Sequence, residues 1–157
     1  MKKYAIELKW GIIFFAAILL WAVFEKYIGL HDERIDKHHI LTNFFAIPAI
    51  LIYVLALLDK RKWLGGQITW TQGFVCGLIV AVVVAILSPV SQYLTHNFLS
   101  PEFFPNIIDS SLKHGKLDRD QAEAFFNLGN YIKQSMIGAI MMGAATSAIV
   151  ALFIKRR

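Results

Sequence analysis

The residues with the clearest chemical potential are histidines and acids gathered in one short segment. His31, His38 and His39 fall within residues 25–39, and the same segment holds four acids: Glu25, Asp32, Glu33 and Asp36. Imidazole nitrogens and carboxylate oxygens are common zinc ligands, and a site usually takes three or four of them. The candidate ligands here are His31, Asp32, Glu33, His38 and His39. Their spacing matches no standard zinc motif, so the sequence favours a solvated polar loop and predicts no metal or other cofactor.

No other pattern points to catalysis. Cys76 is the single cysteine and lies inside an apolar run, where a small buried side chain is the usual role. The chain shows no glycine-rich phosphate loop, no cysteine pair and no nucleophile elbow. The sequence therefore predicts a protein that is not an enzyme.

The elements that must position these residues are apolar helices. Hydrophobic residues make up 57% of the 157-residue chain, against about 45–50% in ordinary soluble domains. Four stretches lack Asp, Glu, Lys and Arg, and these are residues 10–24, 41–58, 70–94 and 134–154. A spanning helix needs about 20 residues, and charged flanks can extend the first stretch. We predict an all-α membrane protein, one domain over 1–157, with transmembrane helices at about 5–28, 40–58, 69–94 and 132–154.

Two segments, 29–39 and 95–131, connect the predicted helices on one side, and 59–68 connects them on the other. Within the longer segment, Ser100-Pro101-Glu102 is typical of a helix start, and Gly115 is a plausible stop. Asp118, followed three residues later by Gln121, resembles a capping box. We expect a short amphipathic helix between the third and fourth spans, followed by a second helix.

The distribution of charge predicts the orientation. Segments 1–9, 59–69 and 155–157 together hold nine basic and two acidic residues, whereas 25–39 and 95–133 hold seven basic and nine acidic residues. Basic residues in short flanking segments favour the cytoplasm. Both termini are therefore predicted to be cytoplasmic, with the histidine-rich segment on the opposite side.

The predicted spans contain almost no charge. Glu7 is close enough to the first span to matter, and we expect it to pair with Lys2 or Lys3 at the surface. Ion-coupled transporters place ionisable groups at membrane depth, so their scarcity argues against that class. Pro48 and Pro89 fall inside spans and predict kinks. Ser88, Ser91 and Gln92 are candidates to bond the carbonyl group that loses its donor to Pro89.

Small residues recur every four positions in the last two spans. One stripe is Gly73, Gly77, Ala81 and Ala85, and the other is Ala139, Gly143, Ser147 and Ala151. Such stripes allow close approach of helices in lipid. They predict helix packing, either within one chain or between two chains.

Several short motifs resemble an uncharacterised bacterial family of multi-pass membrane proteins, classed as a domain of unknown function. They are Glu25-Lys26, His31-Asp32-Glu33, Phe45-Ala46-Ile47-Pro48-Ala49-Ile50, Leu57-Leu58-Asp59-Lys60-Arg61, Thr69-Trp70-x-Gln72-Gly73-Phe74, Leu87-Ser88-Pro89, Phe104-Pro105-Asn106, Phe126-Asn127-Leu128 and Thr146-Ser147-Ala148-Ile149-Val150. The resemblance covers nearly the whole chain. It implies a protein of the bacterial inner membrane, and it implies no activity, cofactor or catalytic residue.

Three functional hypotheses follow. The first is a membrane protein that acts by helix-mediated assembly, as a homo-oligomer or a small subunit of a membrane complex. The second is a small-solute transporter or channel protomer, and the third is a metal-dependent enzyme that uses the histidine-rich segment. The expected partner in each case is the lipid bilayer. Nucleic acid is not expected, because the net charge of +5 is not clustered on one face.

Overall fold

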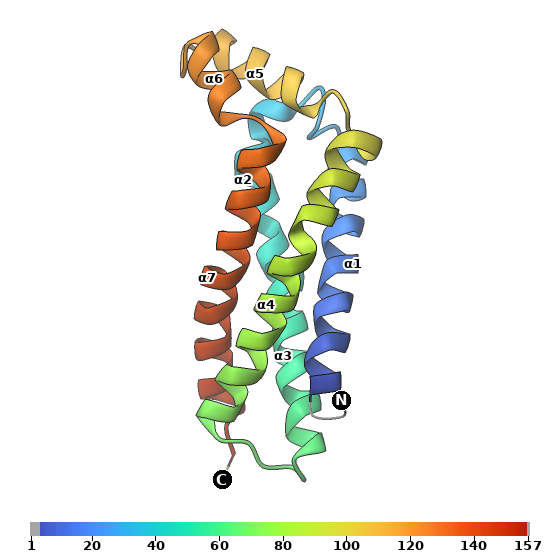
Figure 1. Ribbon diagram of the computed structural model, residues 1–157, viewed down its shortest axis with the longest axis vertical. Helices are drawn as coiled ribbons and strands as arrows, with labels where there is room; N and C mark the ends of the chain where they lie inside the picture. Colours follow the sequence, from blue (N-terminus) through green and yellow to red (C-terminus); the bar gives the residue numbers. More distant parts are fainter. Residues whose placement is uncertain (1–3, 157) are drawn as a thin grey trace.

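Four long helices form an upright bundle in the computed structural model, which describes residues 4–156 (Figure 1). The long helices are α1 (Ala5–Tyr27), α3 (Ala46–Trp63), α4 (Trp70–Leu94) and α7 (Leu128–Ile154). Four shorter elements extend α3 and α4 at one end: η2 (Ile35–Lys37), α2 (His38–Leu41), η3 (Thr42–Phe45) and the π-helical turn η4 (Thr95–Leu99). The helices α5 (Phe103–Lys113) and α6 (Arg119–Phe125) lie across that end. We call it the cap end, and the opposite end, where α1 begins and α7 finishes, the terminal end.

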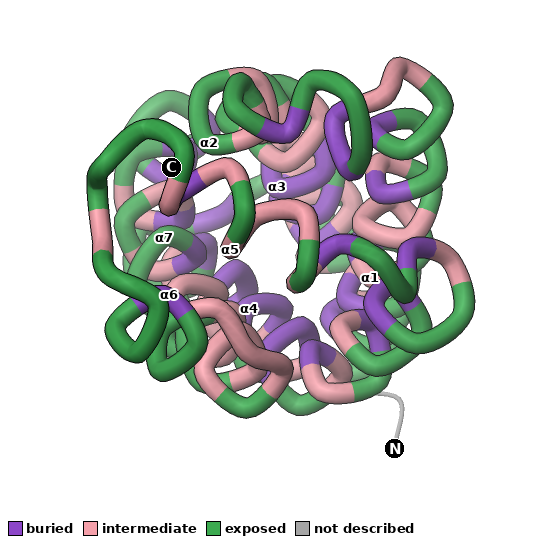
Figure 2. The backbone as a smooth tube through the Cα atoms, turned by 90° about the horizontal axis from the view of Figure 1, so that it is seen from above, coloured by how far each residue is buried: buried purple, intermediate pink, exposed green. Residues whose placement is uncertain are grey.

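The bundle has an apolar outer surface as well as an apolar interior. Each long helix exposes large hydrophobic side chains: Leu20, Ile47, Ile86, Met141 and Phe153 are all at least 66% exposed. Buried residues line the middle of the ring of helices, and exposed ones lie outside (Figure 2). Four helical runs, 5–27, 35–63, 70–99 and 128–154, are long and apolar enough to cross a membrane. The predicted all-α architecture with four such helices is confirmed.

The second span is longer than the sequence predicted. It begins with the short helical turns at Ile35, and α3 continues through the charged run Asp59 to Lys62 as far as Trp63. Lys9 and Trp10 of α1 both donate hydrogen bonds to Asp59, so the charged turn of α3 is joined to the start of α1. Pro48 is the third residue of α3, directly after η3, so it marks a change of helix type near a helix start.

The two stripes of small residues face each other between α4 and α7. A methyl group at Gly73 would lie 3.1 Å from the Ala151 Cβ atom. At Gly77 it would overlap the Ser147 side chain, and at Gly143 it would overlap Ala81 and the Tyr53 hydroxyl group. The helix backbones therefore approach as closely as these positions allow, and they do so within one chain.

Pro89 lies inside α4, and its neighbours are not bonded as the sequence suggested. The Ser88 hydroxyl group donates to the Val84 carbonyl oxygen at 3.0 Å, and Ser91 donates to the Ser88 carbonyl oxygen at 2.9 Å. Neither bonds the Ala85 carbonyl group, which is the one that loses its donor to proline. The expectation that these side chains replace that donor is therefore wrong.

The segment between α4 and α7 starts differently from the prediction and continues as predicted. The α5 helix begins at Phe103, its N-cap position is Glu102, and Ser100 precedes the helix without capping it. Asp118 and Gln121 form a capping box at the start of α6. Gly115, with φ +60°, follows the end of α5. Ser100 is thereby released for the contact described next.

Candidate metal centre

Glu25, His31 and His38 converge at the cap end of the bundle. Each side chain offers one ligand atom, and the three atoms lie within 4.8 Å of one another. The Glu25 Oε2 atom lies 3.4 Å from His31 Nε2 and 3.7 Å from His38 Nε2. Glu25 and His31 are buried, with 5% and 2% exposure, and the His38 side chain is 17% exposed. Three metal-type donors are thus held at one point, largely away from solvent.

The end of α1 brings His31 back over Glu25. The Gly29 N–H group bonds the Lys26 carbonyl oxygen, and the Leu30 N–H group bonds the Glu25 carbonyl oxygen at 2.9 Å. This pair of bonds is the Schellman motif, which requires a left-handed residue, and Gly29 supplies it with φ +82°. The tight reversal buries Leu30 and places His31 beside the last turns of the helix that carries Glu25.

Outer hydrogen bonds orient the donors. The Trp21 indole N–H group donates to Glu25 Oε1 at 2.8 Å, which leaves Oε2 facing the histidines. The Nδ1 atom of His31 lies 2.7 Å from Ser100 Oγ, so its Nε2 atom is the one turned toward Glu25. The Asn106 amide group donates to the His31 carbonyl oxygen at 3.1 Å. Metal-binding histidines usually have such a partner on the second nitrogen, which fixes the ring.

The three donors line a cavity of about 510 Å³ that runs down into the bundle. Its lower wall is apolar and includes Phe14, Ile18, Ala49, Val84 and Ala139. Its upper wall also carries polar side chains from α4 and the turn after it: Ser88, Ser91, Gln92, Thr95 and His96. The donor cluster therefore opens onto an internal space with a polar end and an apolar end.

His96 is a further buried titratable group on this wall. Its Nε2 atom lies 3.0 Å from Gln92 Oε1, while its Nδ1 atom has no hydrogen-bond partner among residues 4–156. Because Gln92 Oε1 can only accept, Nε2 carries the proton and Nδ1 of the neutral ring keeps a lone pair. The Phe103 ring is 1% exposed and touches three histidine rings, with centroids 5.2 Å from His31, 5.1 Å from His38 and 4.7 Å from His96.

The family described as "Protein of unknown function (DUF4199)" matches residues 9–156. The chain belongs to this family. The match includes all three donors and the whole cavity wall, and it agrees with the resemblance to an uncharacterised family. No curated protein and no solved structure matches the chain.

In this family member, the structure brings two of the five candidate ligands together and leaves the other three apart. His31 and His38 come together, whereas Asp32, Glu33 and His39 are exposed and lie outside the cluster. The expectation of a solvated loop is wrong for His31, which α1 and Ser100 enclose. The third donor, Glu25, lies near the end of α1, within the first predicted helix, and was not among the candidate ligands.

Sequence reasoning did not identify Trp21, Ser100 or His96 as part of this site. The Trp21–Glu25 pair has the i,i+4 spacing of helix neighbours, and this spacing could have revealed it. Ser100 and His96 had no such signal, because they follow His31 by more than 60 residues and meet it through tertiary packing alone.

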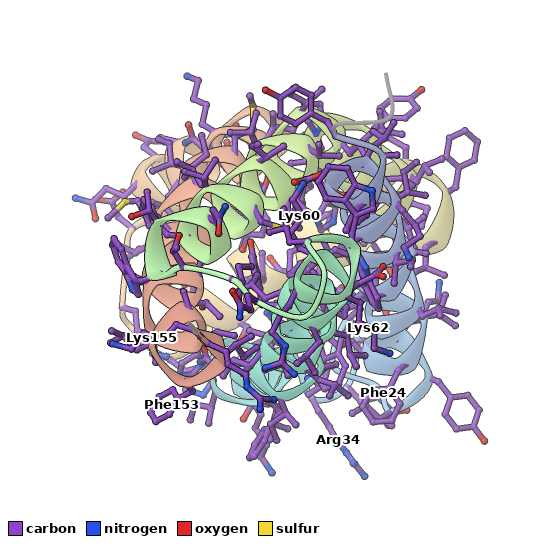
Figure 3. All side chains as sticks on the ribbon, turned by 90° about the horizontal axis from the view of Figure 1, so that it is seen from below. Phe24, Arg34, Lys60, Lys62, Phe153 and Lys155 are labelled. Atoms are coloured by element: carbon purple, nitrogen blue, oxygen red, sulfur yellow. The ribbon has the colours of Figure 1, made fainter. Side chains whose placement is uncertain are left out.

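A second buried acid lies at the terminal end. The Glu7 Oε1 atom lies 2.7 Å from Lys60 Nζ, and the two side chains are 2% and 11% exposed. Lys60 lies further inside the ring of helices than the other labelled side chains, such as Lys62 (Figure 3). The expectation that Glu7 pairs at the surface is therefore wrong; Lys2 and Lys3 lie outside the described residues.

Proposed function

We propose that this protein is a membrane-embedded metal-binding protein, with Zn²⁺ held by Glu25, His31 and His38. The observation that carries the proposal is the convergence of three donor atoms within 4.8 Å inside a helical bundle. Two imidazoles and one carboxylate form a ligand set that Zn²⁺ uses in catalytic sites, where water or substrate takes the fourth position. The cavity borders all three side chains, so that position has room for a ligand.

The distances support this assignment. Tetrahedral ligands at zinc bonds of about 2.0–2.1 Å lie about 3.4 Å from one another. The Glu25 Oε2 atom lies 3.4 Å and 3.7 Å from the two imidazole Nε2 atoms, close to this separation, and all three ligand atoms lie within 4.8 Å of one another. The bonds from Trp21 to Glu25 and from Ser100 to His31 already hold two of the three donors in place.

Metal analysis of the purified protein tests the proposal. We expect one zinc per chain, and we expect Co²⁺ to replace it with the visible absorption of a four-coordinate site. Glu25→Gln and His38→Asn should abolish stoichiometric binding, because each removes one of three donors. His39→Asn is the matched control, since His39 is adjacent in sequence and exposed.

The competing possibility is a hydrogen-bonded cluster that only fastens α1 to the cap end. In that case neither Zn²⁺ nor Co²⁺ binds stoichiometrically to the folded wild-type protein. Equal loss of metal in His39→Asn and His38→Asn would likewise overturn the proposal, because it would indicate nonspecific histidine binding.

We also infer that the protein lies in the bacterial inner membrane with both termini in the cytoplasm. The support is the excess of basic residues in segments 1–9, 59–69 and 155–157. The metal centre would then lie near the opposite face. Reporter fusions after residues 64 and 157 should behave as cytoplasmic, and fusions near 33 and 115 as exported. A cytoplasmic signal at 33 or 115 would contradict this orientation.

Helix-mediated assembly remains a prediction, as does the alternative of a transporter or channel. The stripes that suggested assembly, represented by Gly77 and Ser147, pack against each other inside the chain. They are therefore not available to a second copy in this arrangement. The metal centre is better supported, because its donors converge and border a cavity.

A further inference from the structure

We propose that the cavity binds a single-chain lipid alcohol, with its hydroxyl group at the metal centre and its hydrocarbon chain in the apolar lower part. This inference rests on the proposed metal site and adds the chemical class of the molecule that the site receives. Three features carry it: where the cavity opens, how its apolar wall is placed, and which hydrogen-bonding groups its polar end presents.

The cavity has the size and position of a lipid site. Its volume of about 510 Å³ falls within the range of about 300–1,000 Å³ that is typical of small-molecule pockets. Ile50 of α3 and Met142 of α7 both line it, and they are 47% and 66% exposed on the apolar outer surface. The cavity therefore reaches the lipid-facing side between α3 and α7. A hydrophobic molecule can enter from the bilayer without crossing water.

The two helices meet below this opening. The Tyr53 hydroxyl group of α3 touches Gly143 of α7, which closes the bundle toward the terminal end. Above that contact, Ala49 and Ala139 face the cavity with small side chains. The space they leave is bordered by apolar atoms, and burying a hydrocarbon chain there is favourable by about 0.8 kcal/mol per methylene group.

The polar end of the cavity presents a group of hydrogen-bond acceptors. Ser88, Ser91 and Ser135 each donate their hydroxyl proton to a backbone carbonyl group of their own helix. Their oxygen atoms therefore offer lone pairs to a ligand. His96 Nδ1 is a further acceptor, and it is buried without a partner in the described part of the chain. A ligand that brings a proton would satisfy such a wall, and one without a proton would leave it unpaired.

The polar end of the cavity calls for a group that can both bind the metal and donate a hydrogen bond, and a hydroxyl group does both. Its oxygen supplies a lone pair to the open metal position, and its hydrogen supplies a donor to an acceptor such as His96 Nδ1. A fatty carboxylate can bind the metal but brings no proton for the acceptors, and it places a second negative charge near Glu25. An alkane can neither bind the metal nor donate a hydrogen bond to the acceptors. The chemistry therefore favours an alcohol over an acid or a hydrocarbon of equal length.

Photolabelling of the 157-residue protein in lipid nanodiscs tests the inference, after the metal content of the same sample has been measured. The probe is hexadecanol with a diazirine on its chain, and mass spectrometry locates the labelled residues. We expect labels on α3 and α7 beside the cavity. Unlabelled hexadecanol should compete about tenfold better than hexadecane or palmitate, the effect of one buried hydrogen bond.

Two variants sharpen the test. Ala139→Phe fills the apolar part of the cavity and should abolish cavity labelling. Gly138→Phe is its matched control, because a side chain at Gly138 meets nothing within 4 Å. His96→Phe removes the unpaired acceptor and should reduce the preference for hexadecanol over hexadecane.

The outcomes separate this inference from the metal proposal. Zinc present with equal competition by all three compounds, or with labelling unaffected by Ala139→Phe, overturns the alcohol site and leaves the metal site standing. Alcohol-selective labelling without any bound metal overturns the proposed function and supports the alcohol pocket alone. Stoichiometric zinc together with alcohol-selective, Ala139-sensitive labelling supports both.

Discussion

Two buried acids lie at opposite ends of the same helix, and they have opposite surroundings. Glu7, near the start of α1, forms a buried ion pair with Lys60, whose Nζ atom lies 2.7 Å from the Glu7 Oε1 atom. Glu25, near the end of α1, faces the imidazole rings of His31 and His38, and it borders a cavity. The comparison teaches that a buried acid in a membrane helix is not a functional site by itself. Two further side chains with metal-type donor atoms, and space for a ligand, distinguish the second acid from the first.

The largest effect is expected from breaking the ion pair between Glu7 and Lys60 at the terminal end. Lys60→Met leaves the Glu7 carboxylate buried without its cation, and removing one partner of a buried pair costs about 3–5 kcal/mol of unfolding free energy. The double variant Glu7→Gln, Lys60→Met should recover a large part of this loss, because no charge remains buried. Unfolding in mixed micelles measures both variants. Additive losses in the double variant would contradict the pairing, and zinc binding at the cap end should be retained in every variant that folds.

A smaller effect is expected at the close contact between α4 and α7. Gly77→Leu forces apart two backbones that meet at Ser147, and overpacking typically costs about 1–3 kcal/mol. Val82→Leu is the control, since Val82 is 42% exposed on the outer surface. Val83 would be a poor control because it packs against Gly11. Equal stability of the Gly77 and Val82 variants in the same micelle assay would show that the close contact between α4 and α7 does not stabilise the protein.

The cap end should respond in metal affinity rather than in stability. Ser100→Ala removes the partner of His31 Nδ1, and loss of such an outer partner typically weakens metal binding about 10–100-fold. Ser110→Ala, near the end of α5, should leave the affinity unchanged, because Ser110 is neither a donor nor part of the cavity wall. Competition with a chromogenic zinc chelator measures both. An unchanged affinity in Ser100→Ala would mean that His31 is not a ligand.

The smallest expected effect concerns the capping box of α6. Asp118→Ala removes the acceptor for the Gln121 N–H group at 2.8 Å and should cost about 1 kcal/mol. Because α6 contributes no donor and no cavity wall, zinc content should not change. Hydrogen exchange of the α6 amides measures the local loss. A fall in bound zinc would show that the metal centre depends on the whole cap rather than on its donors.

Structural features that depend on residues close together in the chain could be predicted from the sequence. The uncharged run from Trp70 to Leu94 predicted α4, because the membrane requires such a run and nothing else in a small protein explains it. The Asp118–Gln121 spacing predicted a helix start for the same reason, since the capping bonds join residues three apart. These features depend on neighbours in sequence and need no tertiary information.

The candidate site could not be predicted to the same extent. His31 and His38 were recognised as candidates by residue type, but their burial depends on Ser100 and Phe103, which arrive from a distant part of the chain. Glu7 illustrates the same limit, since its partner Lys60 lies on another helix. Pairings between helices determine which polar residues are solvated, and a single sequence does not contain them.

The order of residues along the chain has a consequence for biosynthesis. All three donors are complete once His38 has been made, whereas Ser100, which holds His31, follows 62 residues later. At about 5–20 residues per second, this interval is on the order of several seconds. During this interval, the nascent chain contains all three donors but lacks Ser100 and the cavity wall formed by α4. If the cluster binds the proposed Zn²⁺, the ion has access to all three ligands before the bundle closes.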